Sequence, residues 1–161
     1  MKTVSFFLFA LLGSCALFTG CNSVPKMSDI GVTLVGFHPV ESPTDSPRAI
    51  MTLRFHSENM NPAGFTKSTH EVYFGKLLLG NAENATPVGL PSMGSVNVDV
   101  VLNISDPALV RRILAVSDKT KYRLKSTLFY TVDDNKLSYK TSEEGEVEIQ
   151  GLETAASASI K

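Results

Sequence analysis

The sequence contains no tryptophan and only two cysteines, Cys15 and Cys21, both near its start. No cysteine remains further along the chain to form a disulfide or a thiolate metal site, so the domain must be stable through its hydrophobic core alone. Neither sign of charge dominates, since 15 basic residues stand against 16 acidic ones, for a net charge of -1. This near-neutrality gives no electrostatic reason to expect a nucleic-acid partner.

Long hydrophobic runs are also lacking. The apolar run from Val4 to Leu12 follows the positively charged Lys2. It is too short for a transmembrane helix, which needs roughly 20 apolar residues. A positive start followed by a short apolar run is typical of a secretory signal peptide. We therefore expect residues 1–20 to be a signal peptide that takes no part in the fold.

The end of this segment resembles the lipobox of bacterial lipoproteins, in which an apolar residue and two small residues precede a cysteine that becomes acylated. The stretch Phe18–Cys21 fits this pattern, with Phe18 in place of the more usual leucine. The stretch Leu12–Cys15 is a second match, but cleavage there would leave an unusually short signal. The resemblance implies lipidation of Cys21, by acyl chains such as palmitate, with Cys15 as the alternative.

Acyl chains on Cys21 would hold the protein at a membrane, because each buried CH₂ group contributes roughly 0.8 kcal/mol. Residues 21–28 would then be a tether, residues 29–150 the domain, and residues 151–161 a flexible tail of small and polar residues. In lipoproteins of double-membrane bacteria, Asp after the cysteine favours retention in the inner membrane. Asn22 stands there instead, so the resemblance implies the outer membrane, facing the periplasm.

Most of the chain after the tether alternates between apolar and polar residues, which is the period of a half-buried β-strand. Proline- and asparagine-rich breaks separate the alternating segments, as at Ser42–Pro47 and Asn59–Pro62. The alternation predicts that these residues point into a core: Ile30, Val32, Leu34, Ala49, Met51, Leu53, Phe55, Val96, Val98, Val100, Leu102, Tyr122, Leu124, Leu128 and Tyr130.

The segment between these clear strands is harder to divide. We expect Ala63–Ser68 to be a loop with Phe65 pointing inward. After it we expect a strand over Glu71–Leu79, a turn at Gly80-Asn81 and a short edge strand over Ala85–Val88. A Gly-Asn pair tolerates the positive φ angles that tight hairpin turns need. The stretch Leu90–Gly94 is predicted to be another break.

Only one segment has helical spacing. Pro107 suits a first helical turn, Ser105 or Asp106 can cap it, and an apolar stripe runs to Leu114. About seven short antiparallel strands with one helix predict an all-β protein, a β-sandwich of the immunoglobulin or fibronectin type.

The order of these features is that of one known family. A strand closed by Asn61-Pro62 is followed by Gly80-Asn81, by the break at Leu90–Gly94, by the helix and by a closing Gly145-Glu146-Val147. This order resembles the group 2 late embryogenesis abundant (LEA) proteins, whose module is the WHy (water stress and hypersensitive response) domain. The resemblance covers roughly Asp29 to Ile149. It implies the sandwich fold and a role in desiccation and stress tolerance, and it implies no reaction.

The titratable residues form no catalytic or metal-binding pattern. His38, His56 and His70 have no partner at metal-ligand spacing, and we expect His38 to lie in a loop and His56 to be solvated on the polar face of its strand. The acid pairs Asp133-Asp134 and Glu143-Glu144 sit at predicted turns, where Asp can bond its own backbone.

We therefore expect no catalytic residue, no cofactor and no metal. The predicted function is that of a membrane-anchored, non-catalytic lipoprotein with a protective role of the LEA type, which binds protein clients. The alternative is a structural or assembly lipoprotein that pairs a strand edge with an envelope partner. Asn59, Asn61 and Pro62 are the best-matched positions, and we expect them to be structural, because Asn can satisfy backbone groups where a strand ends and Pro fixes the bend.

Overall fold

The structure is a computed structural model that describes residues 25–40, 48–106, 108, 112 and 119–148. The predicted signal peptide, Cys21 and the predicted tail after residue 150 lie outside these residues. One 3-10 turn and nine strands are described: η2 (Met27–Asp29), β1 (Ile30–Val40), β2 (Arg48–Ser57), β3 (Ala63–Phe65), β4 (Lys67–Phe74), β5 (Leu77–Asn84), β6 (Val88–Leu90), β7 (Ser95–Ile104), β8 (Lys119–Val132) and β9 (Asn135–Glu148).

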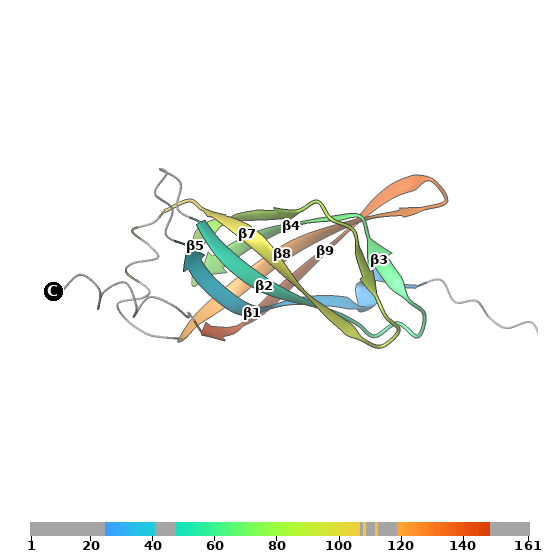
Figure 1. Ribbon diagram of the computed structural model, residues 1–161, viewed down its shortest axis with the longest axis horizontal. Helices are drawn as coiled ribbons and strands as arrows, with labels where there is room; N and C mark the ends of the chain where they lie inside the picture. The colour runs from blue at the N-terminus through green and yellow to red at the C-terminus, as the bar shows by residue number, and fades with distance from the viewer. Residues whose placement is uncertain (1–24, 41–47, 107, 109–111, 113–118, 149–161) are drawn as a thin grey trace, which may run out of the picture.

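Seven strands form one antiparallel sheet in the order β1-β2-β7-β5-β4-β8-β9, and β3 pairs with β6 in a two-stranded ribbon. The sheet curls until it nearly closes into a barrel, so that β2 and β7 pass in front of β8 and β9 (Figure 1). The all-β prediction is confirmed. A sandwich has two separate sheets, whereas here a short pairing of Gly80–Ala82 with Leu102–Ile104 joins β5 to β7 and makes one sheet of both halves.

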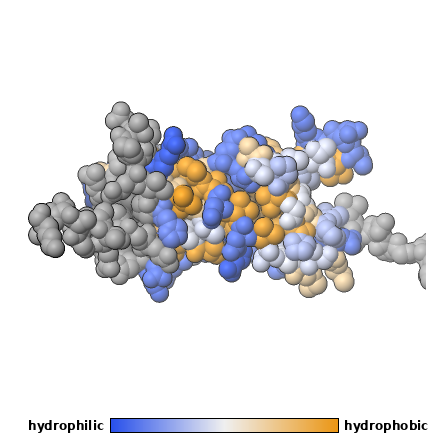
Figure 2. Space-filling model, viewed as in Figure 1, coloured by the Kyte–Doolittle hydropathy of each residue, from blue (hydrophilic) through white to orange (hydrophobic). Residues whose placement is uncertain are grey.

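The alternation predicted the inward face of the sheet. On β2, Ala49, Met51, Leu53 and Phe55 are all 0% exposed, as is Leu102 on the neighbouring β7. The outward face is not purely polar, because Ile50 and Val101 lie opposite each other on β2 and β7 and are 38% and 50% exposed. Figure 2 shows apolar residues across the middle of this face.

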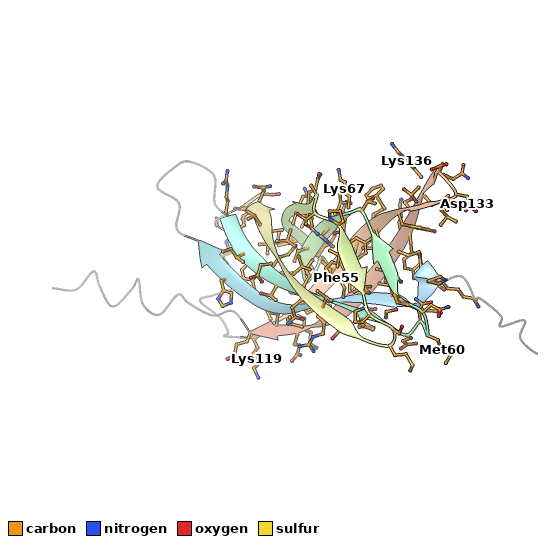
Figure 3. The ribbon with its side chains drawn as sticks, turned by 45° about the vertical axis from the view of Figure 1, so that its right-hand side comes forward. Phe55, Met60, Lys67, Lys119, Asp133 and Lys136 are labelled. Atoms are coloured by element: carbon orange, nitrogen blue, oxygen red, sulfur yellow. The ribbon has the colours of Figure 1, made fainter. Side chains whose placement is uncertain are left out.

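Aromatic rings meet at the centre of the core. The ring of Phe55 lies 4.9 Å from that of Phe65 and 5.9 Å from that of His70, measured between centroids. Figure 3 shows Phe55 inside the curled sheet. Phe65 is buried as the sequence predicts, although Ala63–Phe65 is a strand and β4 already begins at Lys67, so the predicted loop over Ala63–Ser68 is wrong.

The turn predicted at Gly80-Asn81 is also wrong. The chain reverses at Gly75-Lys76, where Gly75 has a φ of 61°, a conformation that glycine adopts at least cost. Gly80 instead lies inside β5. A Cβ there would stand 2.1 Å from the carbonyl oxygen of Asn103, so this glycine permits the close approach of β5 and β7.

The predicted edge strand over Ala85–Val88 begins later than expected. Asn84 ends β5 by a side-chain turn: its Oδ1 accepts from the backbone N–H of Thr86 at 3.1 Å, and its Nδ2 donates to the carbonyl of Thr86 at 2.9 Å. Such side-chain turns compete with the hydrogen bonds of a strand. Pairing resumes at Val88, where β6 joins β3.

Most of the predicted helix from Pro107 to Leu114 lies outside the described residues. Ala108 and Arg112 are described, and both are helical. The backbone N–H of Ala108 donates to Oδ1 of Asp106 at 2.9 Å, which is the bond expected of the predicted cap.

One tyrosine, on the strand next to the edge strand β9, reaches across to the opposite edge strand, β1. The Tyr122 hydroxyl, on β8, accepts a hydrogen bond of 3.1 Å from the backbone N–H of Leu34 on β1. The Tyr122 ring reaches β1 by crossing Gly145, its register partner on β9. A Cβ at Gly145 would lie 2.9 Å from the Tyr122 hydroxyl oxygen, so only glycine leaves room for the ring.

We predict that Gly145→Ala lowers the free energy of unfolding by about 1–3 kcal/mol, because the added methyl group displaces the Tyr122 ring. Gly89→Ala is the matched control, since nothing lies within 4 Å of a Cβ at Gly89, and it should change stability by less than about 0.5 kcal/mol. Urea unfolding followed by circular dichroism measures both. Equal losses in the two variants would contradict the role of Tyr122 in closing the sheet.

Candidate functional site

The outer face of the sheet carries a polar surface that crosses five strands. Strand register places its residues in two rows, and inward-facing neighbours such as His70, Ala82 and Ser126 are buried behind them. We call this surface the polar array. Its first row is Asn103, Asn81, Glu71, Lys125 and Ser142, and its second row is Glu83, Thr69, Thr127 and Lys140.

Three charged members of the polar array contact residues at its margin. The Tyr73 hydroxyl donates to Oε2 of Glu71 at 2.7 Å, and this hydrogen bond raises the pKa of the Tyr73 phenol. Lys125 Nζ lies 4.9 Å from the centroid of the Tyr73 ring. Lys67 Nζ pairs with Oε1 of Glu83 at 2.8 Å. These contacts hold the side chains in place while leaving them at the surface.

The polar array lines a groove of about 740 Å³. Two lysines and two glutamates balance in charge, and amide and hydroxyl groups fill the positions between them. Such a surface offers hydrogen-bond donors and acceptors to a polar partner without favouring either sign of charge.

His70 lies in the core behind the array and is only 1% exposed. Its Nδ1 is 2.8 Å from the Ser126 hydroxyl and its Nε2 is 2.9 Å from the Ser68 hydroxyl. A neutral imidazole satisfies this arrangement by donating from one nitrogen and accepting at the other. Burial lowers the pKa of His70 from 6.5 to about 4, so the ring is neutral at pH 7. The sequence pattern did not single out this residue.

A second, smaller pocket of about 170 Å³ lies where β1 approaches β9. Asp29, His56, Glu58 and Glu143 are among its lining residues. Within the described part of the chain, no group of three or more His, Cys, Asp or Glu side chains is placed to hold a metal ion.

The two acid pairs are placed differently by the structure. Asp133 and Asp134 form the β8–β9 turn, as predicted, with φ angles of 48° and 64°. Glu143-Glu144 lies inside β9 and not at a turn. Because strand side chains alternate, Glu143 faces the β1–β9 pocket, while Glu144 faces outward and pairs with Arg123 at 2.6 Å. The members of this pair therefore do not converge on one site.

Two of the three histidines also differ from expectation. His38 is exposed but lies in β1 and not in a loop, because that strand continues through His38 to Val40. His56 is half-buried rather than solvated, since its ring lies over Gly31 on β1, where a Cβ would be 2.1 Å from His56 Cε1. Packing across the strand pair explains the burial of His56.

Asn59 has the structural role that the sequence predicts. It is 6% exposed, its Nδ2 donates to the carbonyl of Lys26 at 3.0 Å, and its Oδ1 accepts from the Lys26 backbone N–H at 2.8 Å. These bonds fix the segment before β1, so that Met27, assigned to the tether from sequence, is buried in the core.

No protein-family model matches the chain, and no curated protein matches its sequence. The solution structure of AT1g01470 from Arabidopsis thaliana is similar with a TM-score of 0.52 at 14% identity, covering 83% of this chain and 91% of that one. The resemblance to the LEA family is confirmed for the fold. An identity this low shows the fold alone.

Two further structures are similar at lower scores. The solution structure of At2g46140.1, described as a late embryogenesis abundant protein, has a TM-score of 0.47 at 13% identity over 94% of this chain and 86% of that one. A crystal structure of a protein from Archaeoglobus fulgidus has a TM-score of 0.41 at 13% identity, covering 76% and 97% of the two chains. Within the described part of the chain, no helix has the length and hydrophobicity needed to cross a bilayer.

We predict that the stability of the protein falls as the pH is lowered from 6.5 towards 4, in part through His70. Its pKa is lowered to about 4 in the folded state, against 6.5 for the ordinary side chain. In this window only the unfolded chain binds the proton, so the His70 contribution is complete above the upper value and is lost at up to ~1.4 kcal/mol per pH unit below it.

The measurement is urea unfolding between pH 4 and 7 for the wild type and for His70→Gln, which should lose this part of the slope. His38→Gln, at an exposed histidine, is the control and should keep it. An unchanged slope in His70→Gln would show that His70 is not the group responsible.

Proposed function

We propose that this protein is a lipid-anchored, non-catalytic module that protects components of the cell envelope during water loss. The observation that carries the proposal is the LEA-like fold, found in a chain whose sequence landmarks resemble the same family. The polar array supports it, because exposed amide, hydroxyl and charged groups can replace water around the polar groups of a partner. The clients would be proteins or surfaces that lose hydration, and the expected location is the periplasmic face of the outer membrane.

The finer description of the fold belongs to the same proposal. We take β1-β2-β7 and β5-β4-β8-β9 as the two layers of an immunoglobulin-like sandwich that are joined along one side. The short pairing between β5 and β7 supports this, since only Gly80–Ala82 and Leu102–Ile104 take part in it.

The lipid anchor predicts a sharp difference between the two cysteines. Cys21→Ser should remove the acyl mass from the mature N-terminal peptide and release the protein from membranes, because no acyl chain would remain to partition into lipid. Cys15→Ser is the control and should change neither. Mass spectrometry of the N-terminal peptide and membrane fractionation provide the readouts, and an acylated N-terminus in Cys21→Ser would assign the anchor elsewhere.

The protective role predicts that the leaderless chain, residues 22–161, preserves the activity of a labile enzyme through drying and rehydration better than an equal mass of albumin. Protection should fall when Lys125 and Lys140 in the polar array are both changed to Glu. Changing Lys136 and Arg112, which are exposed outside the groove, both to Glu makes the same change in net charge and should preserve protection.

Two results would count against this function. Protection no greater than that of albumin would contradict the protective role itself. Equal protection by the two double variants would leave the role standing but would remove the polar array from it.

An assembly role is the second candidate, and one feature of β7 favours it. Among the described strands, β5 pairs with β7 only at its end, from Leu102 to Ile104. The same edge over Ser95–Val101 has no described strand beside it, and exposed strand edges can accept a strand from another chain. Ile50 and Val101 add exposed apolar surface nearby. Crosslinking in membranes separates the assembly role from the protective role. One stoichiometric partner favours assembly, and the lack of such a partner favours protection.

A further inference from the structure

Two exposed methionines lie next to the segment that leads to the predicted anchor. Met60 follows β2 and is 80% exposed, and Met93 lies in the turn before β7 and is 70% exposed. They are the most exposed of the large apolar side chains in the described residues. Figure 3 shows Met60 at one end of the molecule and Lys119 at the other.

Hydrogen bonds of Asn59 join both methionine loops to the entering chain. The Asn59 side chain bonds the backbone of Lys26 on both sides, at 2.8 and 3.0 Å. The Asn59 carbonyl accepts from the backbone N–H of Met93 at 2.9 Å, and Met60 is the next residue along the chain. Lys26, Met60 and Met93 therefore belong to one hydrogen-bonded unit, which we call the entry unit.

The length of the tether limits how far the entry unit can be from a lipidated Cys21. Residues 22–24 separate Cys21 from Pro25, where the described structure begins. A fully extended chain spans at most about 3.6 Å per residue, so the Cα atoms of Cys21 and Pro25 lie within about 14 Å of each other. A Cys21 whose acyl chains are in the bilayer thus keeps the entry unit at the membrane surface.

The fold itself gives no reason for methionine at these two positions. Neither side chain belongs to the core or packs against it. Met93 has a φ of 47°, a conformation that glycine or asparagine adopts at lower cost. Flexible apolar side chains at exposed loop tips do suit insertion among lipid headgroups.

We propose that Met60 and Met93 insert into the bilayer surface and orient the anchored domain on it. This inference rests on the proposed lipid anchor. The contact with the membrane lies on only one side of the end of the molecule that carries Met60. The β8–β9 turn with Asp133 projects from another side of the same end (Figure 3). In this orientation the polar array, on the wall of the curled sheet, faces the aqueous space and stays open to clients.

The absence of tryptophan from the sequence makes the test direct. Met60→Trp, Met93→Trp and Leu77→Trp each contain one tryptophan as the fluorescent reporter. Leu77 is the control, because it is 57% exposed and follows the Gly75-Lys76 turn, whose Gly75 bonds to Lys121 near the opposite end. Each protein is extracted from membranes with its own N-terminus and reconstituted into phosphatidylcholine vesicles with brominated acyl chains.

The two methionine variants should show blue-shifted emission and lose about half of it or more to the brominated lipid, because tryptophan partitions into the membrane interface. Leu77→Trp should lose none. Equal quenching in all three variants, or quenching only in Leu77→Trp, would overturn the proposed orientation. Shielding of Met60 and Met93 in native membranes but not in vesicles would point to a protein partner and would also overturn it.

Mass spectrometry of the same samples separates this inference from the anchor on which it rests. Acyl mass on Cys21 without quenching would overturn the orientation and leave the anchor standing. If no acyl mass is found, Cys21, the only cysteine of residues 21–161, can be coupled to a maleimide lipid in the same vesicles. Quenching there would support the orientation although the natural anchor had failed, and its absence would overturn both.

Discussion

The architecture depends on bringing the two edges of one sheet together. A single flat sheet would leave its apolar face exposed to water, and here the sheet buries that face against itself by curling. Tyr122 links β8 to the edge strand β1 by accepting a hydrogen bond from the Leu34 amide N–H, and it can do so only because Gly145 on the other edge strand, β9, leaves space for its ring. A buried backbone N–H without a hydrogen-bond partner costs free energy. The Tyr122 hydroxyl therefore helps to close the sheet and also gives the buried Leu34 N–H its partner.

The strands behind the polar array are polar on both faces. Thr69 and Glu71 face outward on β4, while Ser68 and His70 between them face the core. The inward groups satisfy one another, since both nitrogens of His70 meet serine hydroxyls. None of the buried side-chain polar atoms in the described residues lacks a hydrogen-bond partner. The layer of side chains behind the polar array is therefore rigid, because its buried polar groups are hydrogen-bonded to one another.

Anchoring and binding would use different parts of this molecule. The entry unit, with Met60 and Met93, is at the end where the chain leaves towards Cys21. The polar array lies along the wall of the sheet, across β7, β5, β4, β8 and β9. If Cys21 is lipidated as we propose, the short tether would favour orientations in which this end of the domain, and not its wall, meets the membrane. Such a separation would let one small domain bind a lipid surface while its groove remains accessible.

The sequence by itself determined the all-β class and the inward rows, because side chains alternate with a period of two and the apolar residues of β2 and β7 keep that period without interruption. It did not determine at which glycine the chain reverses direction, or which glycine allows β5 and β7 to approach closely. The pair Gly80-Asn81 has the sequence of a tight turn, but the chain reverses at Gly75, where φ is 61°, and the Asn103 carbonyl packs against Gly80. Tertiary structure alone decided the polar array, the burial of His70 and the choice of Lys26 as the hydrogen-bond partner of the Asn59 side chain. Each of these requires residues far apart in the chain to meet, and strand periodicity carries no information on which strands become neighbours.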